Sequence, residues 1–226
     1  MSILKKVLAS AAAAGALGLG FSGSANAADE VVYNLSNPWY LEARIGGPIP
    51  RDYDVSGTFT GSYDPDPGIM IAGNIGKYLT SNIRADLGIS YVWGHDGAFT
   101  LAGGGIVPHS GRVSATTILA NAYYEFSDFS PGLTPWVGVG LGATIFNYDN
   151  LGGGIFYNDS DAAFTAAFHA GLDFALSESV DLTGRYTLSW TGSHSIATTT
   201  GGLAPITIDD QFNNTFTVGV RWKFGG

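Results

Sequence analysis

The chain has 226 residues, of which 13% are charged and 45% hydrophobic, and its formal net charge is −9. Soluble domains usually carry about 25% charged residues, so this composition is unusual for a soluble enzyme. The absence of cysteine excludes disulfide bonds, thiol catalysis and zinc sites with cysteine ligands. The acidic balance, without any basic run, predicts no nucleic-acid partner.

The start of the chain predicts a secretory signal peptide. Lys5 and Lys6 precede an apolar stretch over 7–20, and the small residues Ala25 to Ala27 mark the expected cleavage site. No later run approaches the ~20 apolar residues of a membrane helix, so strands are the elements expected to cross a membrane. The expected organisation is a signal peptide over 1–27, a short periplasmic lead over 28–38 and a transmembrane β-barrel domain over 39–226.

Eight segments of alternating apolar and polar or small residues follow, separated by clusters of Gly, Pro, Asp and Ser. Most approach or exceed the ~9 to 11 residues that a tilted strand needs to cross a bilayer. The links alternate between short and long, as in outer-membrane barrels with tight periplasmic turns and long outer loops. The pattern predicts an all-β, eight-stranded antiparallel up-and-down barrel with both termini in the periplasm. The predicted strands are 39–46, 68–78, 82–93, 114–127, 135–147, 162–176, 179–190 and 212–224.

The alternation separates two faces in each predicted strand. In the third strand, Leu87 and Ile89 occupy one face, while Arg84 and Asp86 occupy the other. Soluble and membrane barrels share this alternation with opposite faces turned inward, so alternation alone leaves both open. Charge balance distinguishes them, because a confined lumen requires paired ions whereas a surface in water does not.

The charged faces of the strands collect equal numbers of acids and bases. The long loops are instead strongly acidic, with only Arg51 and Arg112 against their aspartates. This contrast favours charges inside and lipid outside. Lys77 falls on the apolar face of its strand, where its long side chain is expected to reach the headgroups. The expected lumen charge network consists of Glu42, Arg44, Arg84, Asp86, Glu125, Asp173, Asp181, Arg185, Arg221 and Lys223.

Aromatic residues cluster near the strand ends in the same register. Aromatic rings prefer the headgroup level, so two girdles are expected of a barrel in lipid; aromatic packing in a soluble core is the alternative. One girdle is expected at Trp39, Tyr124, Phe126, Phe174, Trp222 and Phe224, and the other at Tyr91, Trp93, Phe164, Trp190 and Phe212. The glycines Gly138, Gly140 and Gly142 are expected to leave room in the lumen for long side chains from across the barrel.

Several segments together resemble the eight-stranded OmpA-like and opacity-like outer-membrane proteins of Gram-negative bacteria. These segments are 84–91, 120–126, 134–142, 169–174, 180–186 and 218–224. The resemblance implies an outer-membrane barrel with a role in envelope integrity, surface adhesion or narrow solute passage, without the peptidoglycan-binding domain of the full OmpA architecture. Family members usually end on the aromatic residue that the assembly machinery recognises, whereas Gly225 and Gly226 follow Phe224 here.

The leading functional hypothesis is a structural and surface-interaction scaffold with acidic outer loops and a lumen blocked by charge pairs. Its expected partners are outer-membrane lipid and lipopolysaccharide, the barrel assembly machinery, and a host or cell-surface ligand at the loops. Loop acids such as Asp64, Asp66, Asp209 and Asp210 could hold divalent cations, but solvated carboxylates are favoured. The sequence predicts neither a cofactor nor a defined metal site.

Two other function classes remain open. A narrow channel could open through rearrangement of the lumen pairs, with His169 as a titratable group beside Asp173; a hydrogen-bonded histidine without a switching role is the simpler interpretation. An outer-membrane enzyme is the least favoured class, because no catalytic motif fixes the geometry of its candidate loop residues. Those candidates are His95, His109, Ser193, His194, Asp209 and Asp210.

Overall fold

The computed structural model describes most of the chain after the expected signal peptide, which itself lies outside the described residues, as does nearly all of the expected lead. No helix in the described part is long and apolar enough to span a membrane. The described residues are 38–49, 52–56, 60–65, 68–94, 97–101, 106–108, 112–126, 129–151, 157–197 and 205–225.

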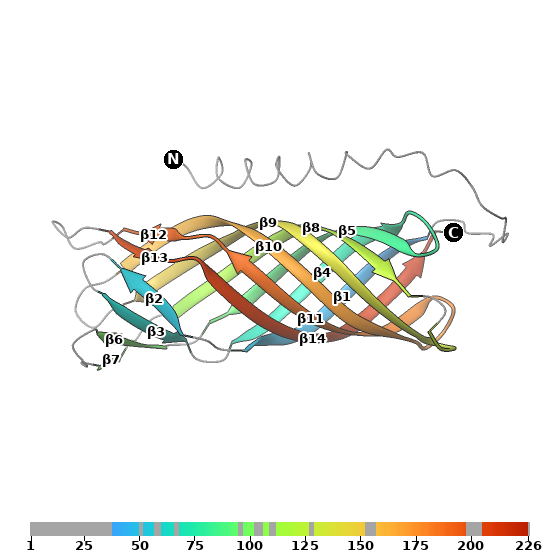
Figure 1. Ribbon diagram of the computed structural model, residues 1–226, viewed down its shortest axis with the longest axis horizontal. Coiled ribbons are helices and arrows are strands. Elements are labelled where there is room, and N and C mark those ends of the chain that lie inside the picture. Colours follow the sequence, from blue (N-terminus) through green and yellow to red (C-terminus); the bar gives the residue numbers. More distant parts are fainter. Residues whose placement is uncertain are drawn as a thin grey trace.

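Eight long strands form a closed antiparallel barrel, as the sequence predicts (Figure 1). Each barrel strand pairs with the next barrel strand in the chain, and the last strand, β14, pairs with the first, β1, to close the wall. Closure leaves no free edge among these strands, which is the condition for a β-structure in lipid. The barrel strands are β1 (Trp39–Ile49), β4 (Ile69–Tyr78), β5 (Ile83–Trp93), β8 (Arg112–Glu125), β9 (Leu133–Leu151), β10 (Tyr157–Ala175), β11 (Val180–Thr191) and β14 (Gln211–Phe224).

A second sheet, which the sequence did not predict, lies at one end of the barrel (Figure 1). It joins short strands from three of the four long links, in the order β12-β13-β2-β3-β6-β7. We call this end of the barrel the loop end, and the opposite end, with the tight links, the short-turn end. The sheet strands are β2 (Tyr53–Ser56), β3 (Gly61–Pro65), β6 (Gly97–Leu101), β7 (Ile106–Pro108), β12 (His194–Ile196) and β13 (Ile206–Ile208).

The prediction that the four long links are irregular loops is therefore wrong in part, because three of them contain short strands. The remaining long link is shorter than expected, because β9 extends to Leu151 and β10 already begins at Tyr157. The added strands are three to five residues long, too short for alternation to reveal. They form hairpins within each link, and the hairpins are joined by pairing between links far apart in sequence, such as Ile208 with Val55. A scan of local pattern cannot detect the pairing between links.

The barrel wall separates an apolar outer face from a polar inner face. On β5, Leu87 and Ile89 are each 55% exposed, whereas Arg84 is 0% exposed. Exposed leucine beside buried arginine is the reverse of a soluble protein and fits a barrel whose outer face contacts lipid. Lys77 lies on the outer face of β4 with its Nζ 5.5 Å from the centre of the Trp39 ring. This cation–π contact stabilises the charge at the end of the strand.

The predicted girdle aromatics sit on the outer face at both ends of the barrel. At the short-turn end, Trp39, Phe126, Phe174 and Trp222 are large exposed rings, and Trp222 stacks on Phe224 with ring centres 5.0 Å apart. At the loop end the ring centres of Tyr91 and Trp93 lie 4.7 Å apart, and those of Phe164 and Trp190 lie 6.2 Å apart. Tyr124 at the short-turn end and Phe212 at the loop end are likewise exposed.

Candidate functional site

Glu42 lies at the centre of the lumen and contacts three guanidinium groups. Arg185 Nη2 donates to Glu42 Oε1 at 2.7 Å, and Arg221 Nε donates to Glu42 Oε2 at 2.9 Å. Arg44 Nε lies 2.8 Å from Glu42 Oε1. These residues come from β1, β11 and β14. The three strands are neighbours in the wall, so their inward side chains lie side by side in the lumen. The carboxylate is thus shared by three buried cations.

Arg221 links this centre to the acids nearer the short-turn end. Its Nη1 donates to Asp173 Oδ2 at 2.5 Å and approaches Glu125 Oε1 at 3.5 Å. Asp181 lies 4.0 Å from the same nitrogen and accepts from Lys223 Nζ at 3.1 Å. Four carboxylates therefore surround one arginine that is fully buried.

Arg84 forms the third part of the network and lies among aromatic rings. Its Nε donates to Glu125 Oε1 at 2.6 Å. Its guanidinium carbon lies 3.9 Å from the centre of the Tyr123 ring and 5.0 Å from that of Trp136. Flat rings over a guanidinium stabilise the cation where water is excluded. The aromatic component consists of four buried rings, Tyr40, Tyr78, Tyr123 and Trp136.

The sequence did not single out these four rings as part of the lumen. A usable signal was present for two of the rings, which occupy the same alternation phase as a network charge: Tyr40 is two residues before Glu42, and Tyr123 is two residues before Glu125. Tyr78 and Trp136 lie on β4 and β9, which carry no residue of the network. Charge marks the inward phase, and the rings that share this phase carry no charge of their own.

Asp86 completes the network mainly through neutral partners, with Arg84 Nη1 at 3.9 Å from its Oδ2. It accepts from the Tyr40 hydroxyl at 2.8 Å, from Asn74 Nδ2 at 2.9 Å and from Asn121 Nδ2 at 2.7 Å. The Asn74 oxygen in turn accepts from Arg44 Nη2 at 2.7 Å. The structure thus brings all ten charged residues of the expected network into one group of contacts, together with amides and phenols that the sequence did not indicate.

His169 points into the lumen, but its partners differ from the expected one. Its Nε2 lies 3.1 Å from Asn121 Oδ1, and its Nδ1 lies 2.9 Å from the Thr187 hydroxyl. Because the Asn121 amide nitrogen donates to Asp86, its oxygen faces the ring, so His169 Nε2 is the donor of that bond. The histidine is fixed between two neutral groups rather than beside Asp173.

The inward glycines of β9 accommodate neighbours on adjacent strands. A Cβ on Gly138 would lie 2.3 Å from the Tyr123 ring, and one on Gly140 would lie 2.2 Å from Asn121 Oδ1. Both neighbours belong to β8, which pairs with β9. The expectation of side chains from across the barrel was therefore wrong, since the space is filled from the next strand.

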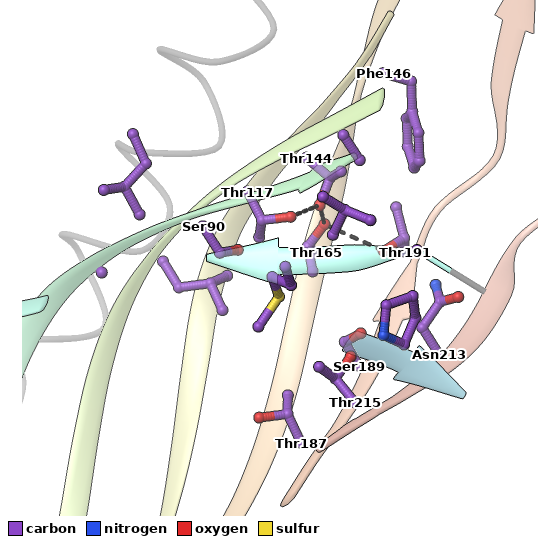
Figure 2. Close-up of a pocket in the computed structure, with 18 of the residues that line it drawn as sticks. Ser90, Thr117, Thr144, Phe146, Thr165, Thr187, Ser189, Thr191, Asn213 and Thr215 are labelled. Atoms are coloured by element: carbon purple, nitrogen blue, oxygen red, sulfur yellow. Dashed lines mark hydrogen bonds between the residues drawn. The ribbon is translucent and has the colours of Figure 1, made fainter. Parts of the chain in front are cut away.

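A cavity of about 210 Å³ lies above the network, toward the loop end. Figure 2 shows the hydroxyl groups on one wall, where Thr144 bonds both Thr117 at 2.9 Å and Thr165 at 2.8 Å, and Thr165 bonds Thr191 at 3.3 Å. Other walls carry aliphatic side chains such as Met70. Small inward residues therefore leave open space at this level, whereas arginine and aromatic side chains fill the lumen below it.

Among the candidate catalytic residues that the structure describes, His194 and Asp210 contact separate partners. His194 stacks on Phe146 with ring centres 4.2 Å apart, and its Nε2 lies 2.5 Å from the Tyr148 hydroxyl. Asp210 accepts the indole N–H of Trp190 at 2.8 Å. His95, His109 and Asp66 lie outside the described residues, and nothing is described of the Asp64 side chain. Within the described part, no cluster of three or more His, Cys, Asp or Glu residues could hold a metal ion.

A closed barrel with an apolar outer face and a charged, filled lumen defines a class of protein that spans a membrane with strands. The family model of the outer membrane protein beta-barrel domain matches residues 8–224, so the chain belongs to this family. The family places the protein in the outer membrane, in contact with lipid, and confirms the resemblance seen in the sequence.

Solved structures with the same fold share little sequence with this chain. Neisserial surface protein A is 18% identical, with 82% of this chain and 97% of that chain covered and a TM-score of 0.56. OprG from Pseudomonas aeruginosa is 12% identical, with 84% and 97% covered and a TM-score of 0.57. AlkL, studied in DMPC lipid bilayers, is 16% identical, with 90% and 97% covered and a TM-score of 0.51. No curated protein gives a significant match. These similarities show the fold alone.

Proposed function

We propose that the protein is a non-conducting scaffold of the outer membrane, which presents its loop-end sheet for interactions at the cell surface. The observation that carries this proposal is the buried charge network centred on Glu42 and Arg221. An unpaired ion removed from water costs several kcal/mol, so opening a path through these pairs is unfavourable. Eight strands also give a bore that side chains can fill completely.

Conductance across a planar lipid bilayer tests this proposal. We expect no conductance steps from the wild-type protein, and none from Phe146→Ala, which removes an aromatic ring above the network. Trp136→Ala removes a ring within the filled layer and should admit a water-filled path. Steps from the wild-type protein, or the same leak from both variants, would refute the assignment of closure to this layer.

A narrow channel is the second candidate, because the cavity leaves the loop-end half of the lumen unfilled. In this case the network would rearrange to extend the cavity to the short-turn end. Small, reproducible conductance steps from the wild-type protein would favour this candidate over the scaffold.

The scaffold proposal places both termini and the tight turns in the periplasm, with the second sheet outside the cell. Because the chain has no cysteine, single-cysteine variants give an unambiguous label. Ser195 in β12 and Ser177 in the link after β10 are both exposed. A membrane-impermeant maleimide should label Ser195→Cys in intact cells and Ser177→Cys only after lysis. The reverse order would invert the orientation.

The proposed partners follow from this orientation. The outer face contacts membrane lipid, and the exposed acids of the second sheet, such as Asp54, lie at the level of lipopolysaccharide. A host or cell-surface ligand would meet the same sheet. The assembly machinery would meet the aromatic end of β14, where Phe224 precedes Gly225, which has a positive φ of 67°.

A further inference from the structure

The cavity in the loop-end half of the lumen has an unbalanced charge on its floor. Arg44 and Arg185 are the charged residues that line it within the described part of the chain. Both are cationic, although the chain as a whole carries a net charge of −9. The acids of the network lie outside this lining.

Glu42 and Asp86, the acids in contact with the residues of the floor, do not line the cavity. Glu42 is shared by Arg44, Arg185 and Arg221, so it compensates the two floor cations only in part. Asp86 is covered by the amides of Asn74 and Asn121, which donate to its Oδ1 and themselves line the cavity. The floor therefore offers a surplus of positive charge to a molecule that enters from above.

The same floor holds hydrogen-bond donors that the protein does not use. Arg185 Nε is buried and has no hydrogen-bond partner among the described residues. Arg44 donates to Thr217 and Asn74, which engages two of the five N–H donors of a guanidinium. Its Nε lies 2.8 Å from Glu42 Oε1 but has no hydrogen-bond partner among the described residues. A buried donor without a partner costs about 1 to 3 kcal/mol, so a shift of a guanidinium group that brings such a donor to an acceptor in the cavity would stabilise the site.

The walls complement an apolar body. Met70, Val92, Leu119 and Phe146 contribute hydrocarbon, and the hydroxyls of the threonine wall in Figure 2 bond to one another. An apolar cavity of about 150 Å³ can hold benzene. A volume of about 210 Å³ therefore suits a six-membered ring with a carboxylate.

We propose that this cavity is a binding site for a small monocarboxylate with an apolar body, of about the size of benzoate. The carboxylate lies on the floor against Arg44 and Arg185, and the apolar body lies between the walls. The filled layer closes the short-turn side, so the molecule enters and leaves at the loop end. This proposal concerns binding alone and does not depend on whether the barrel conducts.

Benzoate and its neutral analogue benzamide provide the test, with the full mature chain in lipid nanodiscs and calorimetric titration as the measurement. We expect saturable benzoate binding at one site and at least about tenfold weaker binding of benzamide, because a hydrogen bond to a charged group contributes about 1.5 to 3 kcal/mol. Methyl resonances of Thr165 and Thr215, which line the cavity, should shift on benzoate addition. Equal affinities for benzoate and benzamide, or no saturable benzoate binding, would overturn the proposal. This test uses the wild-type protein alone, so it does not depend on whether a variant folds.

A pair of variants separates the site from the general charge of the lumen. Arg44→Gln should weaken benzoate binding by at least about tenfold for the same reason. Lys223→Gln removes one lumen cation outside the cavity lining, beside Asp181, and should leave the affinity nearly unchanged. Both variants are first checked for heat-modifiable gel mobility, which reports a folded barrel. The same loss of affinity in both would show that net charge, rather than this site, attracts the anion.

Discussion

Replacing Glu42 by glutamine should cause a large loss of stability. The Glu42 side chain is 0% exposed and lies 2.7 to 2.9 Å from three guanidinium groups. Glutamine preserves the shape but leaves the network with one positive charge in excess. Removing one partner of a buried ion pair costs about 3 to 5 kcal/mol. We expect the lower part of this range, because Arg221 keeps its 2.5 Å contact with Asp173.

Urea unfolding in lipid vesicles, followed by tryptophan fluorescence, measures this loss. Lys223→Gln is the matched control, because its side chain is 25% exposed and its contact is with Asp181; it should cost less than about 1 kcal/mol. The double variant Glu42→Gln/Arg44→Gln restores neutrality and should be more stable than the sum of the single variants predicts. Strict additivity, or equal losses for Glu42 and Lys223, would refute the idea of a coupled network.

Three further outcomes concern the faces, one glycine and the folded state. Leu87→Arg should cost about 2 to 4 kcal/mol on the lipid face and Ser90→Arg less in the lumen; equal urea midpoints would contradict this assignment of the two faces. Gly171→Ala should destabilise because its Cβ would lie 2.1 Å from Trp136, whereas Gly184→Ala meets no atom nearer than 3.9 Å; equal stability would contradict the packing. Unboiled protein should migrate differently from boiled protein in SDS gels, and identical mobility would contradict a folded barrel.

The barrel could be predicted from sequence because its strands are long and one face of most of them is predominantly apolar. On β5 the charges at Arg84 and Asp86 keep one phase while Leu87 and Ile89 keep the other, and lipid tolerates no error in that phase. The second sheet has no such constraint. Its strands β12 and β13 have three residues each, and their stability depends on pairing with β2 from the first loop.

The candidate site was predictable only where charge marked it. Charge is costly to bury, so balanced charges in one alternation phase indicate a common enclosure from the sequence alone. The contacts within that enclosure depend on side-chain length and rotamer. His169 reaches Asn121 on a strand two positions away in the wall, although Asp173 lies on its own strand. The cavity was not predictable, since it reflects the absence of large side chains rather than a motif.

The number of strands is the same in both halves of the lumen, so the halves differ only because the size of the inward side chains changes along the strands. An eight-stranded bore is just wide enough either to be filled by side chains or to hold one small ligand. Near the short-turn end the inward positions carry arginine, tyrosine and Trp136, and the bore is filled. Toward the loop end they carry threonine, serine, alanine and glycine, and the same bore leaves the cavity. Arg44 and Arg185 lie at this boundary, so they close one half of the lumen and give the other half its charge. Exchanging a few inward residues could therefore convert a filled barrel into a binding barrel without altering the strands or the lipid-facing surface.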